Sequence, residues 1–600
     1  MTHFASIGLG TTLAPGILWA RMQDAGETRV TLEMVTDAMK LSGLEFTETE
    51  LKAMVQAANQ NLTRYQELRA IHIPNDVSPP FHFSAIVPGI EINKTKLPFR
   101  LSAPPAVKRP SQLEEVAFWP VRHLAELIRT KQVTSLELTE MYLARLHRYN
   151  AKLNNVVTFL DEHGRAEAKR ADAEIAAGKY KGPLHGIPWG AKDIIAVKGY
   201  KTTWGSPAFK EQSFDYDASV VELLREAGAV LIAKLTTGEL ASGDQWFGGQ
   251  TKSPWNLSQG SSGSSAGPSS ATAAGCVGFG IGTETSGSIL SPAARCGLAG
   301  LRPTFGRISR YGVMALSWTQ DRLGPICRYA EDCAIVMQAV AKPDGRDMSV
   351  SDVPFNWNAQ LDVKKLRVGY IKESFDELTN ATAKQHAQQT LDTLRTIGVS
   401  EFIPMTIPEV PSLSALGALG VESVVFFDEH ARAGRMKEAR GGGRPNGRLI
   451  PAVEYLRSQR LRMMMMMKLA EATAHVDVYL VASNNTGGGD GGGRGGRGGG
   501  RGADPTTPDT AAATTAPTEP PRPQTPAQRH STMANLACYP AINMPNGFAE
   551  NGSPTNVTFF ARPFGEMEML ALAKAYQDAA GFHLKRPTAL DGQTSTVQIG

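Results

Sequence analysis

The chain is short of unbalanced charge, of cysteine and of long apolar runs, and each shortage excludes a class of protein. Its 62 basic and 58 acidic side chains leave a formal net charge of only +4, which supplies no strong field for nucleic acid or an anionic membrane. Its five cysteines form no CxxC pair, which argues against a disulfide framework or a structural zinc site and favours buried thiols. No stretch beyond the N-terminus reaches about 18 uninterrupted apolar residues, so no stable membrane insertion is expected.

The N-terminal region differs in composition from the rest of the chain. Residues 1–22 carry an apolar, glycine-rich run that resembles the hydrophobic part of an export signal, but no basic leader precedes it. Both an export-signal remnant and a docked N-terminal segment fit this pattern, so the location, cytoplasmic or periplasmic, stays open. Residues 23–115 predict a helical cap of two or three amphipathic helices, followed by a proline-rich extended linker.

Residues 116–590 have the pattern of one large α/β domain, and the 42% hydrophobic content is enough for a sizeable core. A helix is expected near Pro120, and Thr134 with Glu137 forms a capping box that opens a second helix. Further on, Gly228 separates a helical pattern from a buried strand at 229–233, which is typical of α/β folds with parallel strands.

A segment of different character, 484–530, interrupts this domain. It is rich in Gly, Arg, Pro and Thr and lacks the apolar residues that would offset its ordering entropy, so it is predicted to be disordered. Its RGG-like tract suggests an alternative function in nucleic-acid binding. From Asn484 to Arg529, however, five arginines face four acidic residues, and this balance favours no nucleic-acid partner.

The block from Gly260 to Arg295 offers several serine hydroxyls on glycine-flanked backbone, which acyl-transfer chemistry requires. Its GSSAG segment also satisfies G-x-S-x-G and would make Ser265 the nucleophile of an α/β-hydrolase elbow. That elbow needs a buried strand directly before it, and the preceding PWNLSQGSS does not predict one.

Three segments of the chain resemble the amidase-signature family. Its signature block resembles residues 259–313, QGSSGSSAGPSSATAAGCVGFGIGTETSGSILSPAARCGLAGLRPTFGRISRYGV, and its G-x-P-x-x-x-K-D segment resembles GIPWGAKDII at 186–195. The family's closing segment resembles ARPFGEMEMLALAKAY at 561–576. The resemblance covers roughly residues 117–483 and 533–582. It implies a large α/β/α layered domain around a mixed, mostly parallel sheet, with no cofactor and no metal.

The resemblance also implies a catalytic set of a lysine, a serine in a cis peptide and a second serine. Ser288 lies 24 positions after Ser264, the spacing of the family's two serines, and Lys192 takes the position of the base. Desolvation of a buried lysine lowers its pKa, so Lys192 can accept a proton that Ser264 relays from the nucleophile Ser288. The backbone N–H groups of Thr285, Ser286 and Gly287 are the expected oxyanion hole.

Two positions depart from the family's usual pattern. The common G-G-S-I-R reads Ser286-Gly287-Ser288-Ile289-Leu290, and the familiar aspartate is Glu284. Because Leu290 stands where the family usually has an arginine, the catalytic set lacks one charged neighbour. We therefore expect altered electrostatics and substrate preference, while all three catalytic residue types remain.

The function implied is an amidase that hydrolyses a small-molecule carboxylic amide to an acid plus an amine or ammonia, through an acyl-enzyme on Ser288. The resemblance identifies no particular substrate, and a homodimer is compatible with it. The family also contains the glutaminase subunit of a tRNA-dependent amidotransferase, whose catalytic set looks the same. The long N-terminal region and the insert are unlike such a compact subunit, so the amidase is the preferred interpretation.

Overall fold

The computed structural model describes residues 30–42, 46–55, 57–59, 83–410, 413–439, 450–484, 524–587 and 589–590. The chain divides into two compact units, residues 1–77 and 78–600, which are described separately. In the first unit, helix α3 (Leu32–Ser42) packs Met34 and Val35 against Leu51 and Met54 of a second helical stretch. The predicted N-terminal helices are therefore present, whereas residues 1–22 lie outside the described residues.

The described residues of the second unit form one large sheet of eleven strands and two small sheets of two strands each. In spatial order the strands of the large sheet are β1 (Val156–Phe159), β3 (Val230–Leu235), β2 (Pro188–Lys192), β8 (Phe279–Glu284), β10 (Arg322–Cys327), β9 (Ala299–Arg302), β14 (Ala541–Phe548), β15 (Pro554–Ala561), β13 (Val478–Ala482), β11 (Val368–Ile371) and β12 (Phe402–Met405). Strands β2, β3, β8, β10 and β13 are buried along their whole length, as expected when helices cover both faces. The mixed α/β sheet is as predicted.

The prediction that this sheet is mostly parallel is wrong. Among the described strands, parallel pairing occurs between β2 and β3, β2 and β8, β11 and β13, and β11 and β12. The middle of the sheet, from β8 through β10, β9, β14 and β15 to β13, is antiparallel throughout. Parallel strands need a crossover such as a helix, which the sequence shows before β3, whereas β14 and β15 are consecutive strands joined by a short turn.

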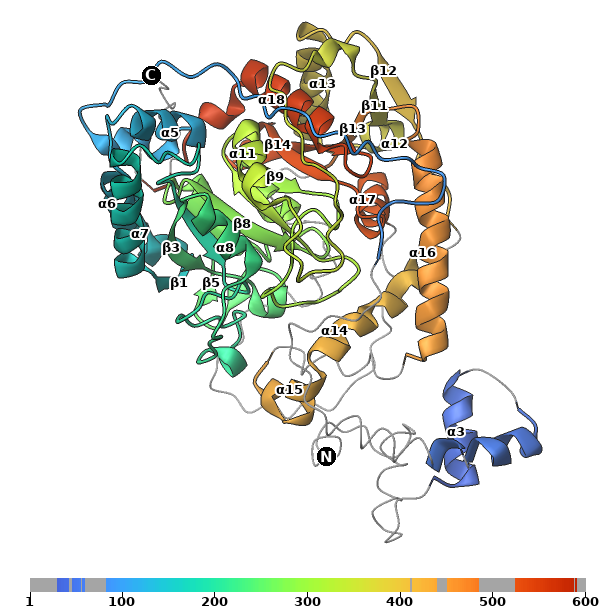
Figure 1. The fold of residues 1–600 in the computed structure, drawn as a ribbon. Coiled ribbons are helices and arrows are strands. Elements are labelled where there is room, and N and C mark those ends of the chain that lie inside the picture. Colours follow the sequence, from blue (N-terminus) through green and yellow to red (C-terminus); the bar gives the residue numbers. More distant parts are fainter. Residues whose placement is uncertain are drawn as a thin grey trace. The chain divides into compact units, whose positions relative to one another are not determined.

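Helices cover both faces of the sheet (Figure 1). Alternate residues of β10 show the two faces, because Cys327 packs in the main core while Ile326 packs with Ile289 and Ala293 in a separate cluster. The helices on the Cys327 face include α8 (Ser219–Glu226), α11 (Ala330–Val340), α13 (Ala381–Thr396) and α18 (Glu566–Ala580). Helices α9 (Ala266–Ala273) and α10 (Leu290–Arg295) contribute to the cluster around Ile326. Further helices of this unit are α12 (Lys372–Asp376), α14 (Val421–Phe426), α15 (Asp428–Arg432), α16 (Ala452–Ala472) and α17 (Pro526–Leu536).

The capping pattern read from the sequence is confirmed at the second predicted helix. Helices α5 (Val121–Arg129), α6 (Ser135–Leu153) and α7 (Asp161–Ala176) flank the β1 edge of the sheet. The Thr134 side chain accepts a hydrogen bond from the Glu137 N–H, and the Glu137 carboxylate accepts one from the Thr134 N–H at 2.8 Å. Before α5, residues 83–112 contain no helix and, apart from an isolated bridge between Arg100 and Asn358, no strand.

The insert predicted at 484–530 lies largely outside the described residues, but its expected end needs correction. Helix α17 begins at Pro526 because Thr525 and Gln528 form a second capping box, a signal that the low-complexity composition upstream obscured. All five cysteines are buried and free, as expected. In the described part of the chain, no helix has the length and apolar character needed to cross a bilayer.

Candidate active site

The sheet topology brings the predicted catalytic residues to one edge. Strands β2 and β8 are parallel neighbours, so their carboxyl ends lie side by side, and these ends carry Lys192 and Glu284. Strand β10 runs antiparallel to β8, so its first residue, Arg322, pairs with Glu284. Ser264 and Ser288 lie just before α9 and α10. Segments far apart in sequence therefore meet at this edge.

Lys192 is fully buried and has three oxygen contacts. Its Nζ lies 2.8 Å from Ser264 Oγ, 2.8 Å from Thr283 Oγ1 and 3.4 Å from the Thr283 carbonyl oxygen. Burial lowers the pKa of the Lys192 amine to about 7, against the raising effect of the Asp321 and Glu284 carboxylates. A large share of this amine is therefore neutral near neutral pH and can accept a proton.

Ser264 is held by backbone contacts as well as by Lys192. The Gly263–Ser264 peptide bond is cis, as the family resemblance implied. The Ser264 carbonyl accepts a hydrogen bond from the Gly238 N–H at 3.2 Å. A Cβ at residue 263 would come within 1.8 Å of the Gly243 carbonyl oxygen, so only glycine fits before this serine.

Ser288 lies in the turn between β8 and α10. Its carbonyl accepts a hydrogen bond from the Ser265 N–H at 3.1 Å, which brings the Ser288 backbone next to that of Ser264. Gly287 has φ +84°, a left-handed conformation that favours glycine. Ser286 is exposed and Thr285, Gly287 and Ser288 are partly exposed, so solvent reaches this turn. Lys192, in contrast, is buried.

Ser265, the nucleophile of the alternative elbow, is engaged elsewhere. Its hydroxyl donates to the Thr283 carbonyl and accepts from the Thr283 N–H, both at 3.1 Å, and the side chain is fully buried. The residues before it form the short strand β7 (Asn256–Gly260), which pairs with β6 (Lys252–Ser253) in a two-stranded sheet separate from the main one. The environment of Ser265 is therefore that of a structural serine.

Glu284, which stands where the family usually has an aspartate, has contacts on both of its carboxylate oxygens. One carboxylate oxygen of Glu284 accepts from the N–H groups of Ile289 and Leu290, at 2.8 and 3.0 Å, and the other lies 2.9 Å from Arg302 Nη1. Burial opposes the ionisation of Glu284, but Arg302 and Arg322 outweigh it and hold its pKa below the ordinary value. The positive charges that act on this carboxylate thus come from Arg302 on β9 and Arg322 on β10.

This buried ion pair yields a stability prediction. Glu284 and Arg302 are both essentially inaccessible, so Arg302→Met would leave a buried carboxylate without its partner and lower the free energy of unfolding by about 3–5 kcal/mol. Denaturant unfolding measures this. The matched control is Arg367→Met, which breaks the more exposed Arg367–Asp477 pair and should cost about 1 kcal/mol or less. An equal loss of unfolding free energy in the two variants would contradict the stabilising role of the buried Glu284–Arg302 pair.

Three further residues at this edge, Asp321, Arg322 and Asn535, were not predicted from the sequence. The Thr285 hydroxyl donates to Asp321 Oδ1 at 2.6 Å, and the Thr285 carbonyl accepts from Asn535 Nδ2 at 2.7 Å and Arg322 Nη2 at 3.3 Å. These contacts fix the turn that carries the expected oxyanion N–H groups. No motif or spacing in the sequence singles out Asn535, which lies on α17 beyond the insert.

Comparison with known proteins agrees with this geometry. The family model described as Amidase matches residues 137–486. The chain is 32% identical over 484 residues to a glutamyl-tRNA(Gln) amidotransferase subunit of Geobacter metallireducens, covering 78% of this chain and 98% of that one. The chain belongs to the amidase-signature family. As a member of it, this protein is an amidase, a hydrolase of amide carbon–nitrogen bonds.

Solved structures share the fold of this amidase. The native peptide amidase from Stenotrophomonas maltophilia matches with a TM-score of 0.63 at 23% identity, covering 78% of this chain and 98% of that one. A protein complex that bears on the evolutionary origins of an s-triazine catabolic enzyme matches with a TM-score of 0.64 at 26% identity, covering 76% and 98%. The predicted amidase-signature fold is thus confirmed.

Proposed function

We propose that this amidase hydrolyses a small-molecule carboxylic amide through an acyl-enzyme on Ser288, with Ser264 as proton relay and Lys192 as base. The observation that carries the proposal is the 2.8 Å contact between the buried Lys192 amine and Ser264 Oγ. A pKa of about 7 suits a group that must take up and return a proton near neutral pH. The reaction needs no metal or cofactor for this proton transfer.

The steps follow from these roles. Ser288 Oγ attacks the amide carbonyl carbon and gives its proton to Ser264 Oγ. Ser264 passes its own hydroxyl proton to the neutral Lys192 amine at the same time. The tetrahedral intermediate collapses, the carbon–nitrogen bond breaks, and the proton returns through Ser264 to the leaving nitrogen. Water then attacks the ester on Ser288 by the same relay and releases the acid.

The backbone N–H groups of Thr285, Ser286 and Gly287 are proposed as the oxyanion hole. The contacts of Thr285 with Asp321 and Asn535 support a fixed geometry for this turn, and a fixed array of donors stabilises developing charge without reorganisation. The partly exposed turn also leaves an approach for the substrate. A donor of this kind is worth about 100- to 1000-fold in rate.

A direct test is hydrolysis of an amide panel by the purified chain alone. We expect release of acid and amine, or ammonia, from at least one aliphatic, aryl or peptide amide without any added protein. A fluorophosphonate should give one adduct per chain by intact mass. The absence of both turnover and adduct in a folded sample would contradict the proposal.

The glutaminase subunit of a tRNA-dependent amidotransferase is the second candidate, because curated relatives are named as subunits of glutamyl-tRNA(Gln) amidotransferase. The same catalytic set would serve it. It predicts glutamine hydrolysis that depends on partner subunits, whereas the preferred interpretation predicts activity on other amides without partners. Comparing glutamine with the amide panel, in the absence of partners, separates the two.

A further inference from the structure

A loop outside the helices and strands, 310–321, ends beside the catalytic edge at Asp321. The Asp321 side chain is partly buried and both of its oxygens are bonded: Oδ1 accepts from the Thr285 hydroxyl at 2.6 Å, and Oδ2 accepts from the N–H groups of Leu316 and Ser317 at 2.7 and 2.9 Å. Burial raises the pKa of Asp321, while these donors and Arg310 favour its ionised form. The loop thus folds around the Asp321 carboxylate, which also accepts a hydrogen bond from the turn of the proposed oxyanion hole.

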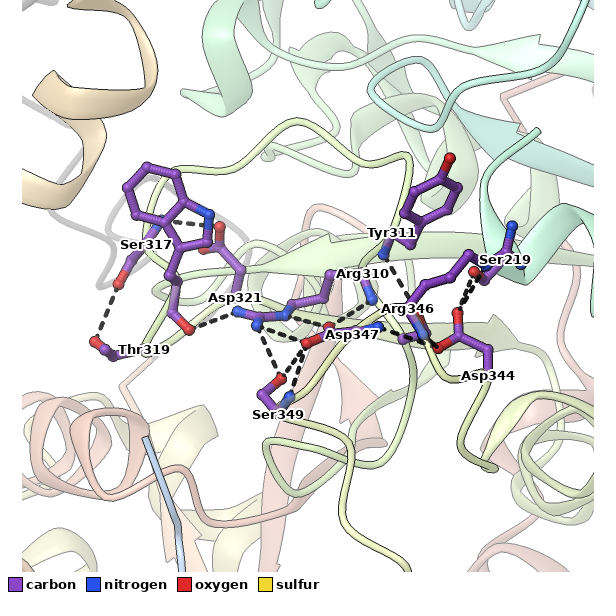
Figure 2. Close-up of polar contacts among 12 residues, drawn as sticks. Ser219, Arg310, Tyr311, Ser317, Thr319, Asp321, Asp344, Arg346, Asp347 and Ser349 are labelled. Atoms are coloured by element: carbon purple, nitrogen blue, oxygen red, sulfur yellow. Dashed lines mark hydrogen bonds and ion pairs between the residues drawn. The ribbon is translucent and has the colours of Figure 1, made fainter. Parts of the chain in front are cut away.

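The start of this loop is clamped by a second carboxylate (Figure 2). Arg310 makes a two-pronged contact with Asp347, Nε at 2.9 Å and Nη2 at 3.1 Å, and its Nη2 also lies 2.8 Å from Ser349 Oγ. Its remaining nitrogen donates to the Trp318 carbonyl at 2.6 Å, inside the loop. This bidentate geometry fixes the arginine, and through it the loop.

The middle of the loop is fastened from helices α14 and α16. Glu422 accepts from the Ser317 hydroxyl at 2.6 Å and the Thr319 hydroxyl at 2.8 Å. Arg462 donates to the Thr319 hydroxyl and carbonyl, both at 2.8 Å. Both side chains are buried, so these contacts are shielded from water.

We propose that Asp321 is a positioning residue of the amide-cleaving site, whose carboxylate orients Thr285 and places negative charge beside Lys192. The proposal rests on the function proposed above. It adds Asp321 as a residue that acts through Thr285 and Lys192. The charged groups that interact with Asp321 are Lys192 and Arg310, Glu284 also acts on Lys192, and Arg322 donates to the Thr285 carbonyl at 3.3 Å. Asp321 differs from them in that its carboxylate holds a side chain of the turn, the Thr285 hydroxyl.

Two effects of Asp321→Asn follow and can be measured separately. A misplaced oxyanion turn slows fluorophosphonate labelling about ten-fold or more at every pH. Loss of the negative charge lowers the pKa of Lys192, so the neutral amine survives to lower pH and the midpoint of the acid limb falls by about one unit. The measurement is the second-order labelling rate across the range in which Lys192 titrates.

Asp347→Asn is the matched control, since it loosens the Arg310 clamp and leaves the charge at Asp321. We expect slower labelling with an unchanged midpoint; Ser349→Ala is the milder form of the same control. If the Asp321→Asn chain does not fold, Asp321→Ser removes the same charge. A folded, charge-removing variant that keeps the parent midpoint would overturn the inference, whereas a parent chain that forms no adduct would instead overturn the proposed function.

Discussion

Ser288→Ala is expected to abolish the covalent fluorophosphonate adduct and to lower kcat about a million-fold. The change removes the only atom that bonds to the substrate carbonyl in the proposed mechanism, while the Ser288 carbonyl still accepts from the Ser265 N–H. The fold should therefore be kept. Intact mass after exposure to the probe gives the adduct, and steady-state turnover of a cleaved amide gives kcat.

The matched control for this variant is Ser265→Ala. Its hydroxyl is bonded on both sides to the Thr283 backbone, so its loss should reduce stability yet leave the adduct in place. An adduct that survives in Ser288→Ala and disappears in Ser265→Ala would reverse the assignment. Thermal unfolding of both variants separates a lost nucleophile from a lost fold.

Lys192→Met is expected to lower kcat by about 10⁴-fold and to remove the acid limb of the kcat/KM profile. The parent should gain activity as pH rises through about 7, because burial sets the pKa of Lys192 there and only the neutral amine accepts a proton. Methionine fills much of the same volume without a base. The pH profile of labelling or turnover is the measurement.

Lys192→Arg tests whether positive charge or basicity matters. A guanidinium stays protonated throughout the accessible range, so this variant should be as inactive as Lys192→Met although it keeps a donor toward Ser264. Substantial activity in Lys192→Arg would mean that Lys192 acts as an electrostatic anchor and that another group is the base. A parent profile without a limb near neutral pH would lead to the same conclusion.

The elements with strong local signals were predictable from the sequence. The capping box at Thr134 and Glu137 and the strand after Gly228 are set by short-range chemistry, and both are present. Lys192 and the cis serine Ser264 were also predictable, because the resemblance supplied a matching motif for the lysine and the spacing from Ser264 to Ser288, and the Lys192 and Ser264 side chains meet. The role of Ser288 stays a prediction.

The supporting residues were not predictable, for a physical reason. Asp321, Arg310, Glu422 and Asn535 act through contacts between segments that are tens to hundreds of positions apart, and a single sequence contains no record of such pairing. The direction of the central strands was missed for the same reason. Periodicity indicates that a strand is buried, but its neighbours are chosen by long-range packing.

The order of strands in the sheet constrains the order in which the protein assembles. β14 and β15 are formed near the end of the chain, yet they lie between β9 and β13 and join the two parts of the sheet. A nascent chain that ends before residue 524 therefore presents β9 and β13 as two open edges and lacks the Asn535 contact with Thr285. The catalytic edge is therefore complete only after the C-terminal part of the chain has been translated. Two fragments separated between β13 and α17 would have to place β14 and β15 of one between β9 and β13 of the other to restore it.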